Sequence, residues 1–206
     1  MILMRYSKTL GAEFTAHLDL MRGIGRTLAR AKIEVKYSQG YHPHLLIFMS
    51  APLGLGIKSY SEYCLIDTDE SAEDFKAKFN KVTRKGIECI GAWETQKKIG
   101  VASDIVKAKY LIKGIGEFDE RDILNSTEFI IKDKNGNDKN VRDLIYEVKR
   151  VDGDVVCVLG FGNGLRVEKF AEKLVERYGG GDLDIIKTEG LTMDGKPFES
   201  VLQGGE

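Results

Sequence analysis

The chain has 206 residues, of which 42% are hydrophobic, enough for a sizeable core and too many for a disordered chain. No run approaches the roughly 18 consecutive apolar residues that a membrane span requires, and the first residues show no signal-peptide pattern. We therefore expect a soluble, cytoplasmic protein without a membrane partner.

The charge of the chain is unevenly distributed. The net charge is −1 overall, but residues 1–66 hold eight Lys and Arg against four acids, so this third carries +4 and the remainder −5. We expect an anionic partner to bind the first third. The three cysteines, Cys64, Cys89 and Cys157, are too few and too scattered for a disulfide framework or a zinc site, and we predict no cofactor.

The first half is predicted to mix strands and helices. Strands are expected over residues 1–6, 62–68 and 87–94, and helices from His17 and over residues 71–82. Between the first helix and the 62–68 strand lie two strand-like runs, residues 33–38 and 45–49, joined by a polar loop. The second run is continuously apolar, as in a strand buried on both faces. These are five strand-like runs, one more than the pattern needs, and we interpret the order as β-α-β-β-α-β, the ferredoxin-like arrangement.

A polar junction over residues 97–107 is the predicted domain boundary. The second half has clear strands over residues 155–161 and 183–192 and a clear helix over residues 167–178, so it also mixes α and β. The predicted fold class is α+β, with a ferredoxin-like domain over residues 1–96. A second, degenerate ferredoxin-like domain is expected over residues 108–194, followed by a mobile tail over residues 195–206.

Three arginines form a stripe on the first predicted helix. Arg22, Arg26 and Arg30 lie four residues apart on one face, a row about 12 Å long with no acid between them. Such a row is usually a solvated face, but in the basic third of the chain it also fits phosphates, as does Lys36. Gly23 and Gly25 weaken the same helix and are typical of a close approach by another segment.

The polar loop carries two of the three histidines. We expect side chains of the loop and of the run before it to contact a bound substrate: Tyr37, Gln39, Tyr41, His42 and His44. The two tyrosines can stack on bases. His42 and His44 would need a third ligand, from His17 or Asp19, to bind a metal, and no acidic cluster or cysteine pair accompanies them. We predict no metal.

Several segments together resemble a known family: Met4-Arg5-Tyr6-Ser7-Lys8, Ala16 to Arg22, Tyr37 to His44, Ala51-Pro52-Leu53-Gly54 and Ser61-Glu62-Tyr63. The family is the uncharacterised radical-SAM-linked domain, which occurs fused behind a cobalamin-binding radical SAM protein or beside one. The resemblance implies such a partner and favours an RNA substrate by association. The chain itself lacks the C-x-x-x-C-x-x-C run of a radical SAM cluster.

Two hypotheses of function follow. In the first, the chain is an accessory binding protein that presents RNA or another anion to the radical SAM enzyme. In the second, His17, His42 and His44, with Asp19 or Tyr37, form the acid–base or metal site of a small enzyme, most simply a metal-independent ribonuclease. The chain shows no paired carboxylates and no nucleophile motif, which favours binding over catalysis. A scaffold whose loop binds only protein is a third possibility.

Overall fold

A computed structural model describes residues 1–133, 135–162 and 164–202, and the fold is α+β as predicted. The chain divides into two compact units. The first unit comprises Met1–Ile105 and the described residues from Pro197 onward, and the second comprises Val106–Lys196. Across the described residues, none of the helices combines the length and apolar character needed to cross a membrane.

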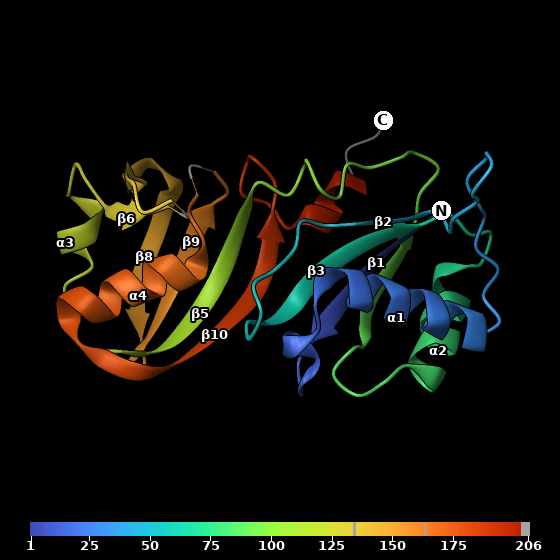
Figure 1. The fold of residues 1–206 in the computed structure, drawn as a ribbon, viewed down its shortest axis with the longest axis horizontal. Helices are drawn as coiled ribbons and strands as arrows, with labels where there is room; N and C mark the ends of the chain where they lie inside the picture. The colour runs from blue at the N-terminus through green and yellow to red at the C-terminus, as the bar shows by residue number, and fades with distance from the viewer. Residues whose placement is uncertain (134, 163, 203–206) are drawn as a thin grey trace. The chain divides into compact units, whose positions relative to one another are not determined.

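The first unit contains a sheet with two helices (Figure 1). Its elements are β1 (Ile2–Lys8), η1 (Ala12–Phe14), α1 (His17–Arg30), β2 (Ile47–Met49), β3 (Lys58–Ile66), α2 (Ala72–Val82), β4 (Cys89–Glu94) and η3 (Phe198–Leu202). β1 pairs with β4 on one side and with β3 on the other, and β2 pairs with β3. All three pairings are antiparallel. Together they place the strands of this unit in the order β4-β1-β3-β2.

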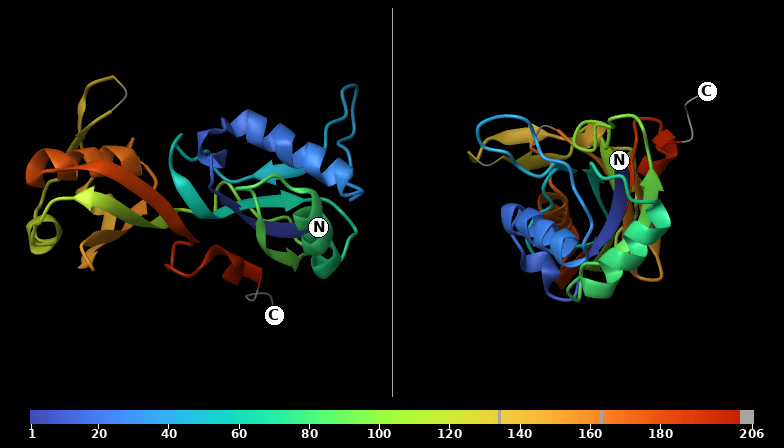
Figure 2. Two further views of the ribbon diagram at one scale, coloured as in Figure 1. Left: turned by 90° about the horizontal axis from the view of Figure 1, so that it is seen from below. Right: turned by 90° about the vertical axis from the view of Figure 1, so that its right-hand side faces the viewer.

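The sheet of the first unit is covered on both faces. Alternate residues of β1 point to opposite sides, so Met4 joins a core with the apolar stripe of α1 and with Phe75 and Phe79 of α2. On the other face, Leu3 packs with Val101, Ile105 and Phe198. Both helices therefore lie on one face of the sheet, as the views in Figure 2 show.

Two local predictions for this unit are wrong. Residues 33–38 do not form a strand: apart from an isolated bridge between Tyr37 and Leu45, the segment is irregular. Residues 45–49 are half-buried rather than buried on both faces, and the strand covers only Ile47–Met49. The reason is topological, because β2 pairs with β3 alone and so has a free edge.

The second unit consists of β5 (Lys107–Ile115), α3 (Arg121–Leu124), β6 (Ile130–Lys132), β7 (Asp138–Asn140), η2 (Arg142–Leu144), β8 (Ile145–Val151), β9 (Asp154–Gly160), α4 (Val167–Tyr178) and β10 (Gly180–Leu191). Its four long strands lie in the order β10-β5-β9-β8, all antiparallel. α4 packs on this sheet, and Phe170 contacts Phe129 with ring centroids 5.3 Å apart. Numbered within the unit, the strand order is 4-1-3-2, the same as in the first unit.

The C-terminal segment differs from the predicted mobile tail. Phe198 is fully buried in the first unit, and Tyr63 contacts it with ring centroids 5.0 Å apart. The Glu199 carboxylate accepts a 2.5 Å hydrogen bond from the Tyr63 hydroxyl and forms a 2.8 Å ion pair with Arg5. These contacts hold η3 on the face of the sheet opposite the helices. Residues 203–206 of the predicted tail lie outside the described residues.

Candidate anion-binding site

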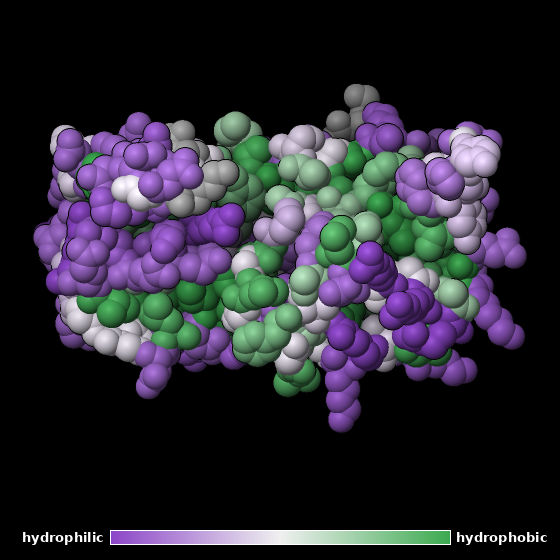
Figure 3. All heavy atoms as spheres, viewed as in Figure 1, coloured by the Kyte–Doolittle hydropathy of each residue, from purple (hydrophilic) through white to green (hydrophobic). Residues whose placement is uncertain are grey.

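Helix α1 begins without a side-chain cap, since its N-cap is Ala16. Asp19 in its first turn and Arg30 in its last turn complement the helix dipole. The helix buries Leu20, Ile24 and Leu28 against the sheet, so the arginines four residues apart are left at the surface. The predicted stripe is therefore confirmed as an exposed row on α1. Figure 3 shows strongly hydrophilic side chains gathered along α1 and beside α2.

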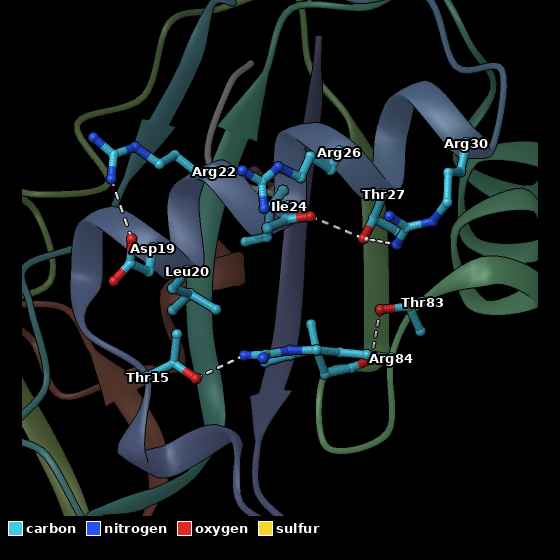
Figure 4. A pocket seen from close by; sticks show the side chains of 12 residues that line it. Thr15, Asp19, Leu20, Arg22, Ile24, Arg26, Thr27, Arg30, Thr83 and Arg84 are labelled. Atoms are coloured by element: carbon cyan, nitrogen blue, oxygen red, sulfur yellow. Dashed lines mark hydrogen bonds and ion pairs between the residues drawn. The ribbon is translucent and has the colours of Figure 1, made fainter.

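The row borders a pocket of about 470 Å³, which we call the arginine groove. It is lined by four arginines, three threonines, one aspartate, one glycine and three apolar residues: Arg22, Arg26, Arg30, Arg84, Thr15, Thr27, Thr83, Asp19, Gly23, Leu20, Ile24 and Ile87. One wall is α1, and the opposite wall is the connection between α2 and β4, from which Arg84 extends toward Thr15 (Figure 4). The groove thus receives guanidinium groups from both sides.

The single carboxylate of the groove is already paired. Asp19 forms a 3.2 Å ion pair with Arg22, and both side chains are about two-thirds exposed, at 64% and 65%. In the part of the chain that the structure describes, no carboxylate pairs with Arg26, Arg30 or Arg84. Three positive charges of the groove are therefore uncompensated, which is the electrostatic requirement for binding an anion.

Threonine hydroxyls hold two of these guanidinium groups in place. Arg84 donates a 2.7 Å hydrogen bond to Thr15 Oγ1, and Arg30 donates a 3.0 Å bond to Thr27 Oγ1. Thr27 is buried and donates in turn to the Gly23 carbonyl at 2.9 Å. Neutral partners fix the direction of a guanidinium without cancelling its charge. The site is accordingly oriented before a ligand arrives, which lowers the entropy cost of binding.

The two glycines of α1 have different surroundings. A Cβ at Gly25 would lie 3.2 Å from Leu45 Cδ1, so this glycine permits the close approach that the sequence predicts. A Cβ at Gly23 would meet no atom within 4 Å, because Gly23 borders the open groove. The segment that carries Leu45 therefore contacts α1 at Gly25, a position outside the groove lining.

The histidine loop is a separate feature. Its arms are joined by hydrogen bonds from Ser38 N to the His44 carbonyl at 2.8 Å and from Leu46 N to the Lys36 carbonyl at 2.9 Å. The His44 Nδ1 atom lies 2.8 Å from Ser38 Oγ, which also accepts a 3.0 Å bond from the His44 backbone N–H. This pair closes the base of the loop. The outer residues Gln39, Tyr41 and His42 are exposed, and Tyr41 is 94% exposed.

Lys36 is engaged in ion pairs at the edge of this loop. Its Nζ lies 2.7 Å from Asp69 and 3.4 Å from Asp67. The hydrogen bond to Asp69 raises the pKa of Lys36, and the same bond lowers the pKa of Asp69. Asp67 and Asp69 thus offset the positive charge of Lys36, which the sequence analysis expects to contact phosphate.

The predicted site residues fall into two groups. The groove brings together Arg22, Arg26 and Arg30 with Arg84, whereas none of the six predicted residues between Lys36 and His44 lines it. His17 is the first residue of α1 and is half-buried. Within the described residues, no three His, Cys, Asp or Glu side chains are grouped as a metal site would require.

Arg84 is the residue that sequence reasoning missed. Its only signal is the basic pair Arg84-Lys85 between a predicted helix and a predicted strand, which is common in solvated connections. Packing of α1 on α2 and pairing of β4 with β1 bring this connection opposite Thr15, 69 residues away in the chain. No local sequence pattern predicts a contact between residues so far apart in the chain.

Fold and groove define an α+β protein with a cationic groove built on one helix. Residues 1–179 match the family described as "Uncharacterized protein conserved in bacteria (DUF2344)", and the chain belongs to this family. No curated protein matches the chain.

Three solved structures match the chain at low sequence identity. A chain of a Cbf5–Nop10–Gar1 complex is 11% identical with a TM-score of 0.47, and a chain of the archaeal box H/ACA sRNP Nop10–Cbf5 complex is 12% identical with a TM-score of 0.45. Each similarity covers 92% of this chain but only 48% and 47% of those chains, so the protein spans about half their length. An unknown protein from Galdieria sulphuraria is 11% identical with a TM-score of 0.25, covering 90% of this chain and 96% of that one.

Proposed function

We propose that the protein is an accessory binding module that presents RNA to a radical SAM enzyme of the cobalamin-binding type. The arginine groove is the observation that carries the binding part of this proposal. Three of its four arginines pair with no carboxylate among the described residues; these three lie on two facing walls, and two of them are oriented by threonines. The partner rests on the resemblance of residues 4–66 to the radical-SAM-linked domain.

RNA suits the surface better than a small isolated anion does. The row from Arg22 to Arg30 is about 12 Å long, which exceeds one phosphate and is comparable to the reach of a short stretch of backbone. Tyr37 and Tyr41 are 58% and 94% exposed, so their rings are available to stack on unpaired bases. The histidine loop would then supply base contacts, while the groove supplies phosphate contacts.

The fold assignment is part of the same proposal. The first unit has its elements in the order β-α-β-β-α-β and its strands in the antiparallel order β4-β1-β3-β2. We assign it to the ferredoxin-like arrangement. In the second unit, α3 with the β6–β7 hairpin stands between β5 and β8, in the place of the first helix, which makes that unit the degenerate copy.

Fluorescence anisotropy with a labelled single-stranded RNA tests the binding. If the three arginines neutralise about three phosphate charges, the logarithm of the association constant should fall with the logarithm of salt concentration with a slope near −2. That slope corresponds to an affinity loss of about 20-fold between 50 and 200 mM salt. Arg26→Gln should reduce the slope by about 0.7, whereas Arg121→Gln, an exposed change on α3 in the second unit, should leave it unchanged.

Two outcomes would contradict the proposal. Affinity that does not depend on salt would exclude a phosphate-binding groove, and equal effects of Arg26→Gln and Arg121→Gln would place the RNA elsewhere. The partner is tested separately by anaerobic affinity purification with the tagged chain as bait. Failure to recover an iron–sulfur protein of the radical SAM class would remove that part of the proposal alone.

The histidine-dependent ribonuclease has a weaker basis, because none of His17, His42 and His44 lines the groove. The same labelled RNA measures cleavage directly. Under the binding proposal the RNA is recovered intact, and His42→Ala changes its affinity but not its length.

A further inference from the structure

The charge density of the arginine groove exceeds what one phosphodiester needs. Four guanidinium groups and a single carboxylate surround about 470 Å³, a volume typical of a site for a small molecule. An internal phosphodiester carries one negative charge, whereas a terminal phosphomonoester carries about −1.5 to −2 at neutral pH and offers three strong acceptor oxygens. Three uncompensated arginines match the second group better than the first.

The donors are also arranged on two sides of the groove. Arg26 and Arg30 belong to α1, and Arg84 reaches along the opposite wall, as Figure 4 shows. A phosphate group between the walls can accept hydrogen bonds from both, which suits the several free oxygens of a chain end. Planar guanidinium groups favour such contacts, because each can donate two parallel hydrogen bonds to one phosphate.

Three buried aliphatic side chains also line the groove. Leu20, Ile24 and Ile87 are at most 4% exposed, so they offer little surface on which a base could stack. The groove therefore recognises its ligand by charge and hydrogen bonding, and the phosphate is the group of the RNA that supplies both.

We propose that the arginine groove binds the terminal phosphomonoester of a single RNA strand. This inference rests on the RNA binding proposed above and adds that the strand is held by its phosphorylated end. Arg84, together with Arg26 and Arg30, contacts the end phosphate, and Thr15 is a positioning residue that orients Arg84. The remaining nucleotides run outside the groove.

The experiment compares ten-nucleotide RNAs of one sequence that differ only at their ends. One carries a 5′-phosphate, one a 3′-phosphate, and one has hydroxyls at both ends, each with the same internal fluorophore. We expect one phosphorylated RNA to bind at least tenfold more tightly than the hydroxyl-ended RNA at pH 7.5. The preference should shrink toward pH 5, where the phosphomonoester gains a proton because its second pKa is near 6.

Matched variants separate end recognition from general attraction. Arg84→Gln should abolish the end preference while reducing the affinity for hydroxyl-ended RNA by no more than about threefold. Arg84→Lys keeps the charge but loses the planar fork, and should retain part of the preference. Lys85→Gln, at the neighbouring exposed position, is the control and should change neither value.

The outcomes distinguish the two proposals. Equal affinity for all three RNAs would overturn end recognition and leave RNA binding intact, whereas no binding of any RNA would overturn both. An end preference that survives Arg84→Gln would also overturn the inference. If adenosine monophosphate competes at a concentration equal to that of the phosphorylated RNA, the groove is a small-molecule phosphate site, and the RNA end is not its ligand.

Discussion

The attachment of the C-terminal segment to the first unit gives a measurable stability prediction. Glu199 accepts a 2.5 Å hydrogen bond from the fully buried Tyr63 hydroxyl and forms a 2.8 Å ion pair with Arg5. Glu199→Ala removes the acceptor of that hydroxyl and leaves it the Ser61 hydroxyl at 3.2 Å, and we expect a cost of about 1–3 kcal/mol for the lost buried bond. The ion pair is only about one-fifth exposed, so its loss adds more than the ~1 kcal/mol that is the upper range for an exposed pair.

Tyr63→Phe should cost less, about 1 kcal/mol, because it removes the donor and leaves Glu199 paired with Arg5. In the double variant the hydroxyl is absent when its acceptor is removed. The losses of unfolding free energy in the two single variants should therefore add up to about 1 kcal/mol more than the loss measured in the double variant. This coupling is the specific consequence of the contact between the two side chains.

Urea unfolding followed by tryptophan fluorescence measures the effect, since Trp93 is the only tryptophan and packs against the cluster that contains Tyr63 and Phe198. The control Glu34→Ala, at an exposed position, should change stability by less than about 0.5 kcal/mol. Strict additivity of Glu199→Ala and Tyr63→Phe, or an unchanged midpoint for Glu199→Ala, would refute the reasoning. Either result would mean that the segment separates from the sheet before the unit unfolds.

Two further predictions concern stability. Gly23→Ala should stabilise the protein by about 1 kcal/mol, because the helix gains a better former and a Cβ there meets nothing within 4 Å; Gly25→Ala, with a neighbour at 3.2 Å, should gain less in the same urea titration. Burial raises the pKa of Cys89 to about 12 and also raises the pKa of Cys64 and Cys157, so stability should fall between about pH 9 and 12. In this pH range the unfolded chain loses thiol protons that the native chain keeps, so each cysteine lowers the free energy of unfolding by up to ~1.4 kcal/mol per pH unit. Rapid labelling of the native thiols at pH 8 would contradict this prediction.

Local sequence determined the helices and the position of the arginines. The recurrence of Leu20, Ile24 and Leu28 at helical spacing fixed which face of α1 is buried, and that in turn fixed Arg22, Arg26 and Arg30 at the surface. The same reasoning predicted that Gly23 and Gly25 permit a close approach, which Leu45 confirms at Gly25 but not at Gly23. These features depend on residues within a few turns of one another, where periodicity is informative.

Tertiary structure decided everything that depends on residues far apart in the chain. Arg84 joins the groove only because strand pairing and helix packing place it opposite Thr15, and Phe198 is buried only because the chain returns to the first unit after the second is complete. The histidine loop and the arginine row adjoin in sequence, yet the loop residues do not line the groove. Hydrophobic periodicity specifies which face of an element is buried but not which distant segment covers it, and contacts between distant segments assemble the groove.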